Sequence, residues 1–164
     1  MTHTLNLVDG SFGARIEGTV FRETKAHLDF SNYADDALTV ALDEDDRGMI
    51  LDLGHWADIA REREVDEADG GGIVFSSLSV DGADVRIARR HPKDSFQNLL
   101  AGRPILSTLG GEHRASIRPA LGHVYLVRVE HLHKRAPTVF AKILVVAHRP
   151  GESIVLRWEP LPGA

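Results

Sequence analysis

Three apolar runs close the chain: GHVYLVRVEHL at residues 122–132, VFAKILVVAHR at 139–149 and SIVLRWEPL at 153–161. All three are rich in β-branched and aromatic side chains, which are typical of strands. Pro150 and Gly151 lie between the second and third runs, where residues of these types favour a tight turn. The stretch therefore predicts a three-stranded antiparallel meander.

A turn at residues 150–151 also sets the register of the last two strands. One face then carries only apolar residues, in the pairs Ile143–Trp158, Val145–Leu156 and Ala147–Ile154. The other face is mixed, with the pairs Lys142–Glu159, Leu144–Arg157 and Val146–Val155. We expect Trp158 and Leu156 to be buried against Ile143 and Val145, so that Trp158→Ala costs roughly 3–5 kcal/mol.

The mixed face of the meander holds an apolar patch made of Val124, Leu126, Leu144, Val146 and Val155. An apolar patch of this kind is normally covered by another layer of structure. We expect the N-terminal strands or a helix at 93–101 to cover it, which makes the meander a middle layer.

Shorter strand-like runs precede the meander, separated by turn-rich clusters that favour a mainly β fold. We expect strands at 14–23, 27–30, 73–78 and 85–88, and a hairpin with arms at 37–42 and 49–53. Helical patterns occur at 93–101 and at 55–68, where the apolar stripe fades after Ala60. The sequence thus predicts one mainly β (α+β) domain over residues 1–164. Its architecture is an antiparallel sandwich or curved sheet with a C-terminal three-stranded meander and one or two short helices.

The composition limits the number of domains and the classes of chemistry that the chain can support. A chain of 164 residues is long enough for one domain with a sizeable core. Without cysteine it has no disulfide, no thiolate metal site and no cysteine nucleophile. No apolar run approaches the ~18 residues of a membrane span, and MTHTLNLVDG at the N-terminus does not have the pattern of a secretory signal. We therefore expect a cytoplasmic protein.

Charge is unevenly distributed along the chain. Residues 29–69 hold fourteen acidic residues against three arginines, a net charge of −11, whereas residues 85–164 hold thirteen Lys and Arg against five acidic residues, a net charge of +8. The two segments either neutralise each other within the fold or form exposed patches that dock a partner. The second interpretation predicts a non-catalytic module that binds a protein or itself, with these contact residues: Asp43, Asp45, Asp46, Arg86, Arg89, Arg90, Lys134 and Arg135.

Histidines supply a second hypothesis, a metal-binding protein or a metal-dependent hydrolase. In an extended segment His131 and His133 project to the same side, a spacing used by zinc ligands on strands. A third ligand is needed, and His123 and His148 belong to the opposite end of the meander. We therefore predict no stoichiometric metal site and no cofactor.

The remaining motifs do not indicate a specific chemistry. In DEDDRG at 43–48 an EF-hand loop would place Arg47 in the calcium cage, so a solvated turn is expected. Gly70, Gly71 and Gly72 precede a predicted strand, which is the wrong context for a phosphate-binding loop. RIARRHPK at 86–93 is basic but has no interleaved aromatics, so pairing with the acidic segment is favoured over nucleic acid. No G-x-S-x-G or H-E-x-x-H motif is present, and no catalytic residue is assigned.

A third functional hypothesis is a small-ligand or anion binder that uses the concave face of the sheet. The final strands, GHVYLVR, FAKILVV and IVLRW between residues 122 and 158, resemble the closing strands of some bacterial β-rich domains, including haem-capture lipoproteins. The resemblance covers about a quarter of the chain. It matches no haem-ligating residue here, so it implies a β-rich fold and no particular site.

Overall fold

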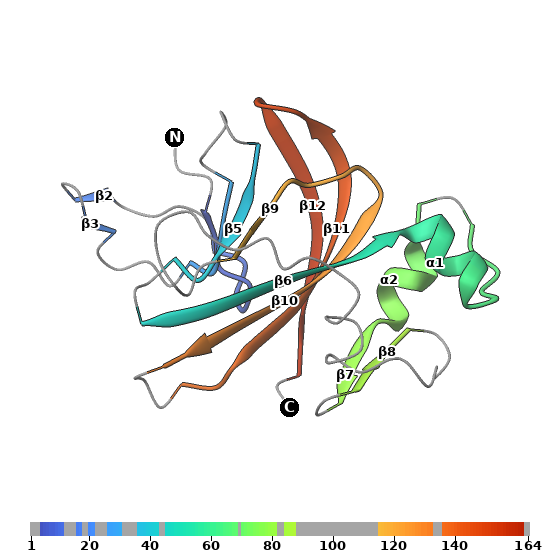
Figure 1. Ribbon diagram of the computed structural model, residues 1–164, viewed down its shortest axis with the longest axis horizontal. Coiled ribbons are helices and arrows are strands. Elements are labelled where there is room, and N and C mark those ends of the chain that lie inside the picture. Colours follow the sequence, from blue (N-terminus) through green and yellow to red (C-terminus); the bar gives the residue numbers. More distant parts are fainter. Residues whose placement is uncertain are drawn as a thin grey trace.

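The computed structural model describes residues 4–11, 16–17, 20–21, 26–30, 36–42, 45–68, 70–81, 84–87, 115–132 and 136–162. These residues form a β-rich fold with two short helices, as the sequence predicts (Figure 1). The expected helix at 93–101 lies outside the described residues. In the part of the chain that the structure describes, no helix has the length and apolar composition that a membrane crossing requires.

The central sheet contains the predicted meander. Its strand order is β12-β11-β10-β6, and every neighbouring pair is antiparallel. The strands are β6 (Asp46–His55), β10 (His123–His131), β11 (Val139–Arg149) and β12 (Ser153–Leu161). Since the two central strands, β10 and β11, carry buried apolar residues on both faces, the sheet is suited to a position between two other layers.

The predicted register of the hairpin is confirmed over most of its length. Lys142 pairs with Glu159, Ile143 with Trp158, and Val145 with Leu156. Beyond Val145 the register shifts by one residue, so that Ala147 lies opposite Val155 and His148 opposite Ile154. The predicted pairs Val146–Val155 and Ala147–Ile154 are therefore wrong, because a β-bulge at this point adds one residue to β11.

A second, smaller sheet packs on one face of the central sheet. Its order is β1 (Thr4–Leu5), β4 (Leu28–Asp29), β5 (Leu38–Val40) and β9 (Ala115–Ile117). β5 belongs to this sheet and β6 to the central one, so the hairpin predicted from 37–42 and 49–53 does not form. Ala41 has a positive φ of 60° that turns the chain between the sheets. The two segments cross in close contact, since a Cβ at Gly48 would lie 2.6 Å from Val40 Cγ2.

Two pairs of very short strands complete the β structure. β2 (Ile16–Glu17) pairs with β3 (Val20–Phe21) and β7 (Ser79–Asp81) with β8 (Asp84–Arg86). The single strand predicted over 14–23 is therefore wrong, because its two ends pair with each other as antiparallel strands, Ile16 with Phe21 and Glu17 with Val20.

The helices are α1 (Trp56–Glu62) and α2 (Gly72–Ser77). α1 is the first half of the helix predicted at 55–68, and it ends where the apolar stripe fades. The strand predicted at 73–78 is wrong, because this segment forms α2 and the glycine triplet opens a helix. The cause lies earlier in the chain: the Glu67 carboxylate accepts hydrogen bonds from the N–H groups of Ile73 and Val74 (3.1 and 2.7 Å), which satisfies the first turn of α2.

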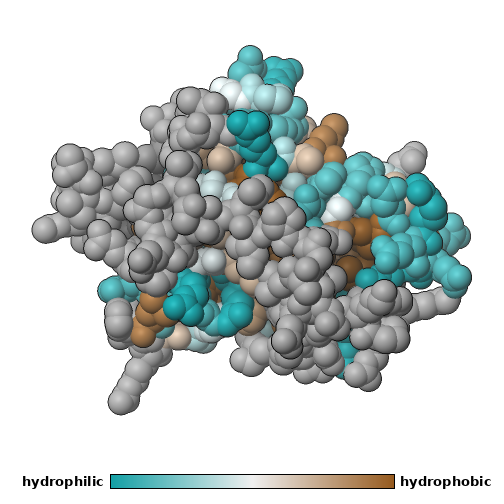
Figure 2. Space-filling model, in the orientation of Figure 1, coloured by the Kyte–Doolittle hydropathy of each residue, from teal (hydrophilic) through white to brown (hydrophobic). Residues whose placement is uncertain are grey.

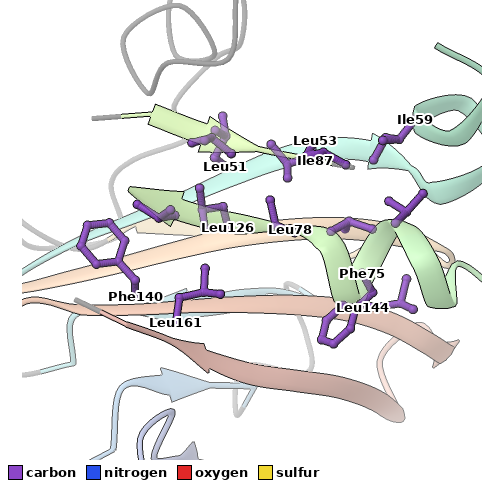
Figure 3. Packing of buried hydrophobic residues seen from close by; sticks show 14 of the residues in the cluster. Leu51, Leu53, Ile59, Phe75, Leu78, Ile87, Leu126, Phe140, Leu144 and Leu161 are labelled. Carbon is purple, nitrogen blue, oxygen red and sulfur yellow. The ribbon is translucent and has the colours of Figure 1, made fainter. Parts of the chain in front are cut away.

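The central sheet is the middle of three layers, as expected. On its mixed face Leu51, Leu126 and Leu144 pack against Ile59, Phe75, Leu78 and Ile87 (Figure 3). Among the described residues the covering elements are α1, α2 and the β7–β8 pair, whereas the N-terminal β1 and β4 pack on the opposite face and the predicted cover at 93–101 lies outside the described residues. Val146 and Val155, at the distal end of the hairpin, stay 53 % and 54 % exposed.

The opposite face of the central sheet packs on the smaller sheet. Tyr125, Val127, Ile143 and Val145 are fully or almost fully buried there against the small sheet's Leu5, Leu28, Leu38 and Val40. The two sheets thus enclose a second apolar core. Hydrophilic side chains cover the end of the molecule at which Figure 1 places α1 (Figure 2).

Candidate functional site: an apolar pocket between two sheet edges

A cavity of about 380 Å³ opens between the edge strand β1 of the smaller sheet and the edge strand β12 of the central sheet. The cavity volume lies within the range of roughly 300–1,000 Å³ that is typical of small-molecule sites. Its lining is mostly apolar: Leu5, Leu28, Phe30, Leu38, Ile154, Val155, Leu156 and Trp158. The polar lining residues are Thr4, Glu152 and Ser153.

The alternation of side chains along β12 determines which of them line the pocket. Ile154, Leu156 and Trp158 alternate along β12 and are partly buried against the core between the sheets. The remaining exposed surface of these side chains lies beside the cavity that they line. The meander thus supplies one wall of the pocket through the apolar face that its sequence predicts, although Trp158 and Leu156 are only half-buried.

The turn after β1 supports the Trp158 ring. Gly10 lies so close that a Cβ there would be 3.0 Å from Trp158 Cζ2, and its φ of +76° suits glycine. Asn6 holds this turn together, because its side-chain oxygen accepts from the N–H of Val8 (2.8 Å) and its carbonyl accepts from the N–H of Gly10 (2.9 Å). The segment 6–11 therefore fixes the position of one pocket side chain.

His27 fastens the β1 wall to the segment that enters β4. Its backbone N–H donates to the carbonyl of Leu5 (3.0 Å), and its Nδ1 accepts from the N–H of Leu7 (3.1 Å). Because a backbone N–H can only donate, Nδ1 is unprotonated in this contact and the imidazole is neutral. Burial is the main cause that lowers the pKa of His27 below its ordinary value of 6.5, and His131 lowers it further.

Beside His27 lies a buried acid–base pair. His131 Nδ1 is 2.6 Å from Asp46 Oδ1, and the rings of His27 and His131 are 6.1 Å apart between centroids. Asp46 is only 4 % exposed, so its charge needs this partner. The carboxylate also favours a proton on His27, as does Asp9, but burial and His131 outweigh both.

At the other end of the pocket, Asp36 holds the tip of the β11–β12 hairpin. Its Oδ1 contacts His148 Nε2 (2.8 Å) and accepts from the N–H of Gly151 (3.2 Å). Burial alone would raise the pKa of Asp36, but the hydrogen bonds from His148 and Gly151 prevail and lower it. Glu152 and Ser153, which follow Gly151, are thereby kept at the rim of the cavity.

A third pair, His123 with Asp52, lies away from the lining residues. His123 Nδ1 is 2.9 and 3.0 Å from the two carboxylate oxygens, next to the bulge where β6 and β10 shift register. Nearby, the hydroxyl of Tyr125 accepts from the N–H of Ala120, and burial raises the pKa of Tyr125 to about 12. These contacts act as a polar anchor at the end of β10.

The three pairs share one arrangement. Each joins an aspartate of the acidic segment 29–69 to a histidine of the meander. Sequence reasoning missed all three, because the partners are 71 to 112 residues apart. Three aspartates of the acidic segment thus have histidine partners within the fold.

The structure describes only some of the residues predicted to bind a partner. Arg86 is exposed, Asp45 is half-buried, and Asp46 is buried against His131. Asp43, Arg89, Arg90, Lys134 and Arg135 lie outside the described residues, as does the metal candidate His133. The structure brings His131 together with His27, a contact that the sequence did not predict.

Among the described residues, no group of three or more His, Asp or Glu side chains is arranged to hold a metal ion. Asp46 occupies Nδ1 of His131, so only Nε2 of that ring could serve as a ligand. The prediction that the protein has no stoichiometric metal site is tested by elemental analysis of the purified protein.

Comparison of the chain with protein-family models, with curated proteins and with solved structures finds no match in any of the three.

Proposed function

We propose that this protein binds a small, mainly apolar ligand in the pocket between β1 and β12. The observation that carries the proposal is the cavity itself, about 380 Å³ and walled by apolar side chains from two separate sheets. Burying a ligand's apolar surface there is favourable by about 25 cal/mol per Å². The hydrogen-bonded turns at its two ends support a largely preformed site, which reduces the entropic cost of binding.

The rim supports a particular class of ligand. Among the described residues that line the cavity, Glu152 is the one that is ionisable, and Ser153 beside it can donate or accept a hydrogen bond. A carboxylate at the rim attracts a cationic head group and repels an anionic one. The ligand is therefore an apolar body with a neutral or basic polar group, and an anionic ligand is disfavoured.

The proposal is tested with N-phenyl-1-naphthylamine, a neutral apolar fluorophore that brightens when it leaves water. We expect saturable binding to the wild-type protein at neutral pH. Ile154→Trp places a larger ring on the inward face of β12 and should weaken binding about tenfold or more, because the added volume occupies the cavity.

Val146→Trp is the matched control, because it adds the same ring to the same hairpin at an exposed position that does not line the cavity. Its affinity should stay within about twofold of wild type. Equal loss in both variants, or no saturable binding by the wild type, would refute a ligand site between β1 and β12.

Association with a protein partner or with itself is the second candidate. Arg86 is exposed, in keeping with a basic contact, and the edge strand β12 exposes Val155 beside Val146. Edge strands and exposed apolar patches are frequent contact surfaces. Sedimentation across a range of salt concentrations separates a charge-driven contact from an apolar one.

A further inference from the structure

The pocket wall depends on a histidine that must be neutral. His27 Nδ1 accepts from the N–H of Leu7, and the backbone of His27 donates to Leu5, which lines the pocket. His27 is 8 % exposed and Leu7 is 0 % exposed, so water has little access to either partner. The contact therefore has no ready replacement if Nδ1 ceases to accept.

Protonation removes that acceptor. An imidazolium ion carries hydrogen on both nitrogens, so Nδ1–H and the N–H of Leu7 would become two donors facing each other. A buried N–H without an acceptor is costly, and this cost is relieved when the segment that holds Leu7 moves away from His27. The segment that moves first is the 6–11 turn, because it begins at this contact.

The charged and titratable groups that face His27 set the pH at which it is protonated. Asp9 approaches from the 6–11 turn, Asp46 from β6 and His131 from β10. Asp46 also lies 2.6 Å from His131 Nδ1, so its carboxylate faces both histidines. Burial and His131 together lower the pKa of His27 below 6.5 despite the two carboxylates.

We propose that mild acidification releases the ligand, with the His27–Leu7 hydrogen bond as the pH-sensitive element. The inference rests on the ligand-binding function proposed above. Movement of the 6–11 turn withdraws Gly10 from the Trp158 ring and displaces Leu5, so the pocket loses support on both sides. Since the ligand binds the form with neutral His27, ligand binding in turn opposes protonation of His27.

The experiment measures the affinity of the wild-type protein for N-phenyl-1-naphthylamine at about pH 7.5 and about pH 5, on either side of the ordinary histidine pKa. We expect binding to weaken about tenfold at the lower pH, within the ~5–150-fold range of coupling between sites. His27→Asn retains an oxygen that can accept from Leu7 and does not titrate, so its affinity should change by less than about twofold.

His123→Asn is the control for histidine titration in general. His123 also pairs with an aspartate but is not among the residues that line the pocket, so this variant should keep the wild-type pH response. A wild-type protein whose affinity does not change with pH, or a pH response that persists in His27→Asn, would overturn the proposal.

A second measurement separates this inference from the binding function. Hydrogen exchange of the Leu7 amide is followed without the fluorophore at both pH values and expressed as a protection factor. Protection should fall about tenfold on acidification in the wild type and stay constant in His27→Asn. If the fluorophore does not bind at pH 7.5 the ligand-binding function fails, whereas constant protection of Leu7 in the wild type overturns the role of His27.

Discussion

Trp158 is half-buried: it packs against the core between the sheets and also lines the cavity. A fully buried tryptophan costs roughly 3–5 kcal/mol when truncated to alanine, but this ring has fewer contacts to lose. We therefore expect Trp158→Ala to lower the free energy of unfolding by about 2 kcal/mol. Urea denaturation at neutral pH measures this value, and a loss above about 4 kcal/mol would mean that the ring is enclosed on both sides.

The contribution of Asp36 to the stability of the fold is expected to depend on pH. Its pKa is lowered in the folded protein, so its contribution to stability is present above the ordinary value of 3.8 and is lost as the pH falls through the lower, folded value. In Asp36→Asn the unfolding midpoint should therefore fall less between about pH 5 and about pH 3 than in the wild type. Asp58→Asn, at an exposed carboxylate paired with Arg61 on α1, should fall as the wild type does. If the unfolding midpoints of all three proteins fall in parallel with pH, the stabilising role of the Asp36 carboxylate is contradicted.

At the level of elements, α2 is attached to the central sheet by Lys142. This side chain is 2 % exposed, donates to the carbonyls of Ser76 and Leu78 at 3.1 Å each, and lies 3.3 Å from Glu159. Lys142→Met keeps the apolar length but leaves both carbonyls without this donor, so we expect a loss of about 1–3 kcal/mol in unfolding free energy and faster hydrogen exchange in α2.

Arg157→Met is the matched control for α2. Arg157 and Lys142 both place a cation over the Phe75 ring, at 4.5 and 5.0 Å from its centroid, but Arg157 is exposed. An exposed cation–π contact contributes about 0.5–1 kcal/mol, so this variant should be less destabilised than Lys142→Met. The reverse order would show that the cation–π contacts, and not the carbonyl contacts, hold α2 in place.

For the whole molecule, the prediction concerns self-association. The acidic and basic segments favour docking of copies at low ionic strength, and screening should weaken it as the Debye length falls from about 10 Å at 0.1 M salt to about 3 Å at 1 M. We expect sedimentation to show an assembly that loosens over this range. An assembly that persists would point to an apolar contact through the β12 edge instead. A monomer at every salt concentration would mean that contacts within one chain, such as that between Asp46 and His131, leave no charged patch able to dock a second copy.

By itself the sequence determined the local and nearest-neighbour features: the mainly β class, the limits of β10, β11 and β12, and the register that pairs Ile143 with Trp158. Alternation along a strand and a Pro-Gly turn are sufficient for these, because both act over a few residues. The bulge at Val146 was not predicted, since a bulge changes the pairing without a distinctive residue to mark it.

Tertiary structure alone decided which elements meet. β5 and β6 enter different sheets, and the segment after the glycine triplet becomes a helix because Glu67 reaches its first turn. The pocket and its flanking histidine contacts join segments from opposite ends of the chain, at Leu5 and Trp158 for the pocket and at Asp36 and His148 for the hairpin tip. No short-range pattern encodes such contacts, because they depend on how the sheets stack and not on the propensity of any one segment.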